Sequence, residues 1–174
     1  THNVVCILQS INRRVIVYPL GQDGQTLNFA DAALAHFKRH RQIRANQVEA
    51  GGQLFASIAG SAVTVQIATG PRRGDQRSPT AYVPNRRAEN KEIARMFDRG
   101  LHYVGDWHTH RECRPVASYL DAQSIHEIFR RSRHQLAGMV IAIVGIELPP
   151  AGLLVAITNG RILHTLSPLP TGCS

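Results

Sequence analysis

The stretch between residues 101 and 121 restricts the structure and chemistry of this chain more than any other. Residues 101–107 are apolar enough to form a β-strand, and His108 and His110 follow at its end. Residues two apart in an extended segment point to the same face, so the two imidazoles should project together. Asp121 follows after a loop. Two imidazoles and a carboxylate match the three protein ligands of a catalytic zinc ion, which keeps its fourth position for water.

Strand geometry favours Asp121 over Asp106 as the third ligand. Asp106 has the same parity as the histidines, but its distance from His110 along a strand is about 13 Å. Asp121 comes from a different element and can complete the ligand set from the side. Ser118 and Asp121 also match a capping box, in which a serine caps a helix and an acid three residues later returns the hydrogen bond. The spacing therefore leaves a metal site and a helix cap as equal explanations, and the two can coexist.

Hydrolysis at a zinc site also needs a general base. The six glutamates are the candidates: Glu49, Glu89, Glu92, Glu112, Glu127 and Glu147. Glu89 and Glu92 fall on a charged predicted helix, where salt bridges are the simpler role. Glu49 precedes a Gly-Gly pair at the start of a strand, where glycines permit a close approach of backbones. The residues alone favour Glu49 only slightly over the other glutamates.

The remaining periodicity predicts an α/β fold with a mixed, largely antiparallel sheet flanked by helices, because several strands follow each other through short turns. Strands are predicted at residues 4–9, 14–18, 48–55, 62–68, 101–107, 139–144, 152–157 and 161–166. Helices are predicted at residues 29–44, with Asn28 as the N-cap, at 86–99 and at 118–131. Residues 70–85 are rich in proline, glycine and arginine, and are predicted to form a mobile flap. We expect a single domain over residues 1–166 and a flexible tail over residues 167–174.

Two compositional features predict where the protein works. No apolar run reaches the roughly 18 residues of a membrane span, and the first residues show no signal peptide. The three cysteines are widely spaced, at Cys6, Cys113 and Cys173. Such an arrangement does not suggest a disulfide framework, so we expect a reducing compartment, the cytoplasm, and no membrane association.

The net charge of +8 makes nucleic acid the first partner to consider. The cations are spread over several predicted helices and loops, which is more typical of a solvated surface than of a binding stripe. One cluster falls at the end of the first predicted helix: Lys38, Arg39, Arg41 and Arg44. An acidic protein partner therefore remains open beside nucleic acid.

Four separated motifs resemble those of the JAMM/MPN family of metalloproteases. They are Glu49-Ala-Gly-Gly-Gln-Leu-Phe, Gly105-Asp-Trp-His-Thr-His, Pro115 and Ser118-x-x-Asp121. Their order and spacing agree with the family pattern of an upstream glutamate, His-x-His, seven residues and Ser-x-x-Asp. The predicted elements from residue 1 to 166 also suit the family fold, which has a cytidine-deaminase-like layout. The histidine motif looks most like the bacterial branch, which includes deconjugating proteases, some of them in anti-phage operons of the CBASS type.

The resemblance implies a role for each motif residue. His108, His110 and Asp121 would bind one Zn²⁺ per chain. Glu49 would accept the proton of the attacking water, and Ser118 would hydrogen-bond to the developing oxyanion. The implied reaction is hydrolysis of the peptide or isopeptide bond after the C-terminal tail of a ubiquitin-like protein or of a conjugated nucleotidyltransferase. That tail would lie extended beside a strand, and the flap would form part of its groove.

Three positions depart from the family pattern. Arg111 stands where the family often has a proline, and Cys113 and Ala117 stand where further prolines are common. None of the three is an implied metal ligand. They therefore bear on the shape of the loop and on substrate preference rather than on the metal.

Other classes of function fit the residues less well. A cysteine protease built on Cys113 and His110 has no further group to activate the thiol. A zinc deaminase needs a Cys-x-x-Cys motif, which the sequence lacks. A non-catalytic scaffold of the same family would usually lack part of the ligand set, which is complete here. A DNA-associated module like the RadC-type proteins stays open because of the positive charge, and it predicts salt-dependent duplex binding.

Overall fold

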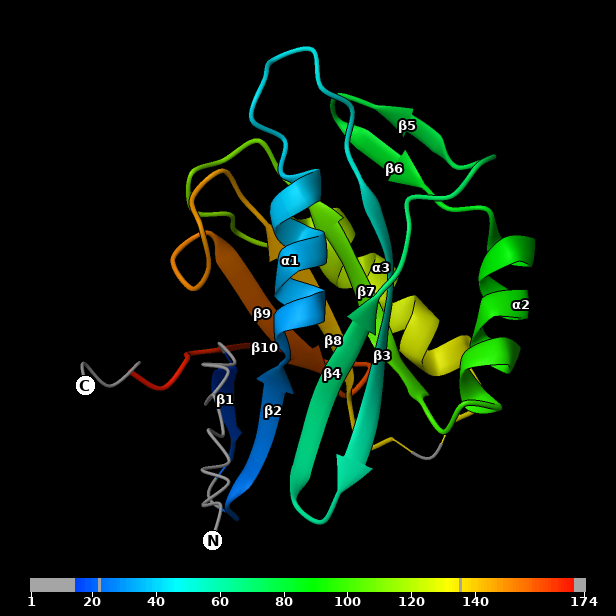
Figure 1. Cartoon of the computed structure of the whole chain (residues 1–174), viewed down its shortest axis with the longest axis vertical. Coiled ribbons are helices and arrows are strands. Elements are labelled where there is room, and N and C mark those ends of the chain that lie inside the picture. The colour runs from blue at the N-terminus through cyan, green and yellow to red at the C-terminus, as the bar shows by residue number, and fades with distance from the viewer. Residues whose placement is uncertain (1–14, 22, 135, 171–174) are drawn as a thin grey trace, which may run out of the picture.

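A computed structural model describes residues 15–21, 23–134 and 136–170 of the chain. These residues form a large curved sheet, a separate two-stranded sheet and three helices (Figure 1). The helices are α1 (Asp31–His40), α2 (Arg86–Phe97) and α3 (Tyr119–Arg131). The large sheet contains β1 (Ile16–Leu20), β2 (Gln25–Phe29), β3 (Gly51–Ala59), β4 (Ala62–Ala68), β7 (His102–Thr109), β8 (Met139–Val144), β9 (Leu153–Thr158) and β10 (Leu163–Leu166). The small sheet is a hairpin of β5 (Gln76–Ser78) and β6 (Ala81–Val83).

The strand order of the large sheet is β1-β2-β4-β3-β7-β8-β9-β10. Neighbouring strands are antiparallel except for β2 with β4 and β7 with β8, which are parallel. The two edges of the sheet curve toward each other, and the backbone N–H of Leu169, just after β10, donates to Val17 O of β1 at 2.8 Å. This nearly closed sheet confirms the predicted α/β class with a mixed, largely antiparallel sheet.

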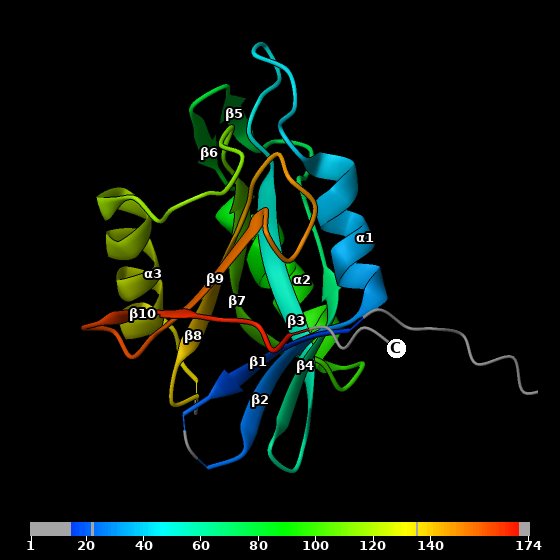
Figure 2. The same ribbon diagram turned by 90° about the vertical axis from the view of Figure 1, so that its left-hand side faces the viewer.

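Helices cover both faces of the sheet, with α1 and α3 on opposite sides (Figure 2). The larger core cluster lies on the α1 side and contains Phe37 and Trp107, whose ring centroids are 5.3 Å apart. The smaller cluster lies on the α3 side, where Ile125 packs against Ile141 and Ile143 of β8. Successive strand residues face opposite sides, so one strand can supply Trp107 to one core and a functional side chain to the other.

The segment around α1 differs from the prediction. Residues 25–29 form β2, so Phe29 ends a strand instead of starting the predicted helix. Leu27 and Phe29 alternate into the core while the strand pairs with β1 and β4. The predicted N-cap at Asn28 is therefore wrong. Its Nδ2 donates to Thr64 Oγ1 at 3.3 Å, and Ala30 precedes the helix without a side-chain cap. The helix ends at His40, so the basic residues from 41 to 44 lie in a loop.

Two further predictions are corrected and several are confirmed. Residues 70–85, predicted as an irregular flap, contain the β5–β6 hairpin. The last strand begins at Leu163 rather than at residue 161, because Asn159 Oδ1 accepts from the N–H groups of Arg161 and Ile162 and extends the loop between β9 and β10. The strands at 62–68 and 139–144 have the predicted bounds, and α2 and α3 lie within two residues of theirs. The predicted strand at residues 4–9 lies outside the described residues.

None of the described helices is both long enough and apolar enough to cross a membrane.

Candidate metal centre and adjoining cavity

His108 and His110 lie at the carboxyl end of β7, on the face that α3 covers. The register with β8 places His108 beside Ile143, and strand parity turns both histidines toward the same side. Their Nε2 atoms are 3.1 Å apart, and their ring centroids are 4.9 Å apart. The structure therefore brings the two imidazoles together, as the spacing predicts.

Asp121 reaches the two histidines from the first turn of α3. Its Oδ1 lies 3.0 Å from His108 Nε2, and its Oδ2 lies 3.5 Å from His110 Nε2. These three residues form the group of potential metal-ligand side chains in the described part of the chain. Asp106 is outside that group and instead accepts a hydrogen bond from Tyr103 Oη at 2.8 Å.

The capping box at the start of α3 is formed as well. Ser118 Oγ accepts from the backbone N–H of Asp121 at 3.1 Å, and Asp121 Oδ2 accepts from the backbone N–H of Ser118 at 2.7 Å. The cap fixes the carboxylate while its oxygens face the histidines. Metal-ligand geometry and helix capping are therefore two properties of one arrangement.

Glu49 is positioned by the pairing of β3 with β7. The next residue, Ala50, donates its N–H to Thr109 Oγ1 at 2.9 Å and accepts from Thr109 N–H at 2.8 Å. Gly51 then pairs with His108 in the antiparallel register. A Cβ at Gly51 would overlap the Tyr82 ring, so glycine permits this close approach. Strand pairing thus brings Glu49 to the end of β7 that carries the histidines.

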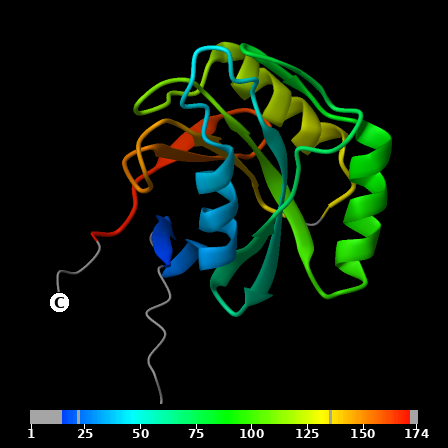
Figure 3. The same ribbon diagram turned by 45° about the horizontal axis from the view of Figure 1, so that its top comes forward.

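One cavity of about 300 Å³ connects these groups. It is lined by all five sequence-predicted site residues: Glu49, His108, His110, Ser118 and Asp121. Residues 80–82 of the β5–β6 hairpin form one wall and α3 forms another. Figure 3 shows the ribbons of this hairpin, in green, and of α3, in olive, near each other. Glu49 is the glutamate that lines this cavity among the described residues. The expected contribution of residues 70–85 to a groove agrees with this wall.

Burial and neighbouring charges set the protonation of these groups. Burial raises the pKa of Glu49, and the charge of Asp121 raises it further, while His108 acts in the opposite direction. Burial and His108 lower the pKa of His110. Burial alone would raise the pKa of Asp121, but hydrogen bonds from His108 and Ser118 hold it well below its usual range. An ionised carboxylate beside neutral imidazole is the state in which such side chains bind a metal.

No sequence pattern points to three other residues that line the cavity, which are Tyr82, Arg86 and Asp106. Arg86 Nη1 lies 3.9 Å from Asp106 Oδ2. These residues come from a hairpin, a helix and a strand, so no local spacing connects them. Only the packed fold places them around one space.

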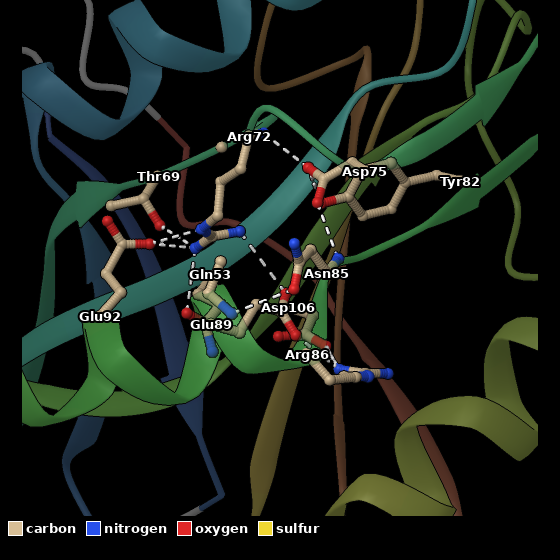
Figure 4. Close-up of polar contacts among 12 residues, drawn as sticks. Gln53, Thr69, Arg72, Asp75, Tyr82, Asn85, Arg86, Glu89, Glu92 and Asp106 are labelled. Atoms are coloured by element: carbon tan, nitrogen blue, oxygen red, sulfur yellow. Dashed lines mark hydrogen bonds and ion pairs between the residues drawn. The ribbon is translucent and has the colours of Figure 1, made fainter.

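The wall formed by residues 70–85 is anchored by Arg72 (Figure 4). The Arg72 guanidinium donates to Gln53 Oε1 at 3.0 Å and to Thr69 Oγ1 at 2.8 Å. It also pairs with Glu92 and lies 3.6 Å from Glu89. The Arg72 side chain is 12% exposed, so a buried cation joins this segment to β3 and α2.

The hairpin itself is held from both ends. Asp75 accepts from Tyr82 Oη at 3.0 Å and from the backbone N–H of Asn85 at 2.8 Å. Gln42 Nε2, from the loop before Glu49, donates to Pro79 O at 2.7 Å. The wall opposite α3 is therefore built from long-range polar contacts.

Comparison with known proteins identifies relatives of this chain. It is 32% identical over 139 residues to a CD-NTase/cGAS isopeptidase from Pseudomonas aeruginosa, an alignment that covers 74% of this chain and 86% of the relative. The chain belongs to the family of this isopeptidase. No protein-family model matches the sequence.

One of two similar solved structures supports the fold, and the fold alone. A solution structure of a Desulfitobacterium hafniense protein superimposes with a TM-score of 0.53 at 18% identity, covering 75% of this chain and 82% of that protein. A solution structure of a Salinibacter ruber protein covers 83% of this chain and 90% of that protein, with a TM-score of 0.40 at 19% identity.

Proposed function

We propose that this protein is a zinc-dependent isopeptidase of the JAMM/MPN type. It would hydrolyse the bond between the C-terminal tail of a conjugated protein and its target. The observation that carries the proposal is the convergence of two imidazole nitrogens and a carboxylate at the end of β7, beside a cavity that also contains Glu49 and Ser118.

The three candidate ligands fit zinc. Zinc–nitrogen and zinc–oxygen bonds of about 2.0–2.1 Å in a tetrahedron place neighbouring ligand atoms about 3.3 Å apart. The two histidine Nε2 atoms are 3.1 Å apart, and Asp121 lies 3.0 Å from His108 Nε2 through Oδ1 and 3.5 Å from His110 Nε2 through Oδ2. With one ligand atom taken from each residue, all three atoms lie within 4.8 Å of one another. Three protein ligands leave one position for water or substrate, which is typical of a catalytic site. When bound, zinc would supply a Lewis acid that polarises the scissile carbonyl and makes water acidic near neutral pH.

Glu49 is the general base in this proposal. It would accept a proton from the attacking water and transfer it to the leaving amine. Its carboxylate lines the cavity, and burial raises its pKa, which makes it a stronger base than an exposed glutamate. The clamp between Ala50 and Thr109 holds the backbone beside it.

Ser118 is the proposed oxyanion donor. Its Oγ already accepts a hydrogen bond from Asp121 N–H, so the hydroxyl proton remains available to a substrate oxygen. A donor fixed before substrate binds needs no rearrangement when negative charge develops on the carbonyl oxygen. The capping box would therefore orient one residue for the metal and the other for the oxyanion.

The substrate class follows from the relative. Its name states that it acts as an isopeptidase on a CD-NTase/cGAS protein. We infer that this chain removes a nucleotidyltransferase or a ubiquitin-like protein from its conjugate in the cytoplasm, within anti-phage signalling of the CBASS type. An extended tail would lie along the wall formed by the β5–β6 hairpin.

The test is Glu49→Gln, because it removes the base without touching a candidate ligand. We expect cleavage of a nucleotidyltransferase conjugate to fall by about 10²–10⁴-fold. Zinc measured by elemental analysis should stay near one per chain. The matched control is Glu147→Gln, whose carboxylate pairs with Arg114 at 3.3 Å on the surface. It should cleave like the unmodified chain.

Two results would contradict the proposal. One is undiminished cleavage by the Glu49→Gln protein. The other is the absence of zinc from protein prepared without chelator. Chelation of the unmodified chain should abolish cleavage, and added zinc should restore it.

A further inference from the structure

A concave basic surface lies at the end of α1 and on the loop after it. This loop is at the top of Figure 1. Four cations define it, and we name it the α1-end cluster: Lys38, Arg39, Arg41 and Arg44. They surround a hollow of about 510 Å³ that is completed by Ile43, Asn46 and Gln47. No carboxylate lines this hollow in the part of the chain that the structure describes.

The loop that carries the α1-end cluster has a defined shape. Gln47 Oε1 accepts from the backbone N–H groups of Ile43 at 2.9 Å and Arg44 at 3.3 Å. Gln47 Nε2 donates to Arg41 O at 2.8 Å. One side chain thus closes the loop on itself, so the hollow is formed without a ligand.

Helix capping explains only part of this charge. Cations in the last turn of a helix interact favourably with its dipole, which accounts for Lys38 and Arg39. Arg44 lies beyond the helix end, where the dipole effect has decayed. Arg41 Nη1 donates to the neutral carbonyl of Ile146 at 2.6 Å rather than to a carboxylate.

The charge of the cluster is also not neutralised by the residues that the structure describes. Ion pairs in the described residues involve Arg72, Arg86, Arg95, Arg114 and Arg131. None of the four cations of the α1-end cluster forms an ion pair with a described residue. Four close positive charges without a partner repel one another, and an acidic ligand would relieve that repulsion.

The α1-end cluster is connected to the cavity that contains Glu49. The same loop continues directly to Glu49, and Gln42 Nε2 ties it to Pro79 O of the cavity wall. Arg77, on β5, donates to Glu49 O and continues the positive charge from the cluster toward the cavity. A protein whose tail occupied the cavity would therefore face this surface.

We propose that the α1-end cluster docks an acidic segment of the protein substrate whose tail enters the cavity. This inference rests on the proposed function, and it adds that the substrate carries Asp or Glu residues outside its tail. The hollow is compact and contains Ile43, which is 54% exposed. An acidic peptide with an apolar residue matches that mixture better than a nucleic-acid backbone, which requires an extended track of cations.

The experiment measures binding and needs neither zinc nor cleavage. The probes are a fluorescent peptide of Asp, Glu and Leu, the same peptide with Asn and Gln, and a single-stranded oligonucleotide of equal charge. The full chain is compared with Lys38→Glu/Arg44→Glu by fluorescence anisotropy at low and high salt. The matched control is Arg130→Glu/Arg133→Glu, because both residues are exposed and stand at the end of α3 as Lys38 and Arg44 do at α1.

We expect the acidic peptide to bind at low salt and to weaken at high salt. The Lys38→Glu/Arg44→Glu change should reduce its affinity at least about tenfold, and the control less than about twofold. The amide peptide should not bind. Equal losses in both double variants, no binding of the acidic peptide, or tighter binding of the oligonucleotide through the same residues would overturn the proposal. Because no arm depends on cleavage, its failure is separable from failure of the isopeptidase proposal.

Discussion

The candidate metal-ligand cluster and Glu49 line the same cavity, yet they are positioned by different kinds of contact. His108, His110 and Asp121 come from one strand–loop–helix unit and are aimed by strand parity and a capping box. The opposite wall depends on β3–β7 pairing, on Arg72 and on Gln42, all of which join segments distant in sequence. The first side is local in sequence and the second is not.

This difference predicts which side responds to which change. Weakening the long-range contacts should loosen the wall and Glu49 while the three ligands keep their arrangement. Weakening the capping box of α3 should reduce the free energy of unfolding by less, because strand parity still directs the two histidines to one face.

Arg72→Met should produce the largest loss of stability. It removes a buried cation and leaves Glu92 and Glu89 without their shared partner, for a cost of about 3–5 kcal/mol. Urea unfolding measures this cost, and hydrogen exchange should show the greatest loss of protection in residues 70–85. Arg114→Met, which breaks an exposed pair with Glu147, is the control and should change stability by less than about 1 kcal/mol. Loss of zinc binding in Arg72→Met at temperatures where the chain stays folded would show that the three candidate ligands also depend on the opposite wall, contrary to this prediction.

Glu89 should make the stability of the folded chain depend on pH. Burial, with the charge of Asp106, raises its pKa from 4.5 to about 7, although Arg86 and Arg72 oppose the shift. The folded state therefore keeps a proton that the unfolded state releases, so stability falls as pH rises from about 4.5 to 7 and stays lower above it. The expected decrease in the free energy of unfolding is on the order of 3 kcal/mol, since a shift of one pKa unit corresponds to about 1.4 kcal/mol.

The measurement for Glu89 is the unfolding free energy between pH 5 and pH 8. Glu89→Gln should remove most of the decline over this range, because the amide does not titrate. Glu147→Gln, at an exposed glutamate, should leave the slope of the unmodified chain. A stability of the unmodified chain that rises over the same range would disprove the assignment.

Ser118→Ala should have the smallest effect on stability. It removes the side-chain acceptor for Asp121 N–H, which costs about 1 kcal/mol in unfolding experiments. Zinc stoichiometry should persist, because His108, His110 and Asp121 remain. Cleavage should nevertheless fall by about 10²–10³-fold if Ser118 stabilises the oxyanion. Ser118→Thr, which keeps a hydroxyl, is the control, and an undiminished rate in Ser118→Ala would remove Ser118 from the proposed mechanism.

Short-range geometry in the sequence was enough to predict part of the candidate site. The same-face placement of His108 and His110 follows from the two-residue repeat of a strand, and the position of Asp121 follows from its capping box with Ser118. The bounds of β4 and β8 follow from apolar patterns that local rules can read. These features need no knowledge of what packs against them.

The tertiary structure decided what depends on distant contacts. Among the six glutamates, the residues alone favoured Glu49 only slightly. The β3–β7 register brings its backbone to the end of β7, and Glu49 lines the same cavity as the candidate metal ligands. Residues 25–29 became a strand because β1 and β4 flank them, which local helix signals do not reveal. The hollow of the α1-end cluster likewise depends on α1 ending at His40 and on Gln47 closing the loop. Pairing and burial between distant segments carry no period in the sequence, so only the folded chain specifies them.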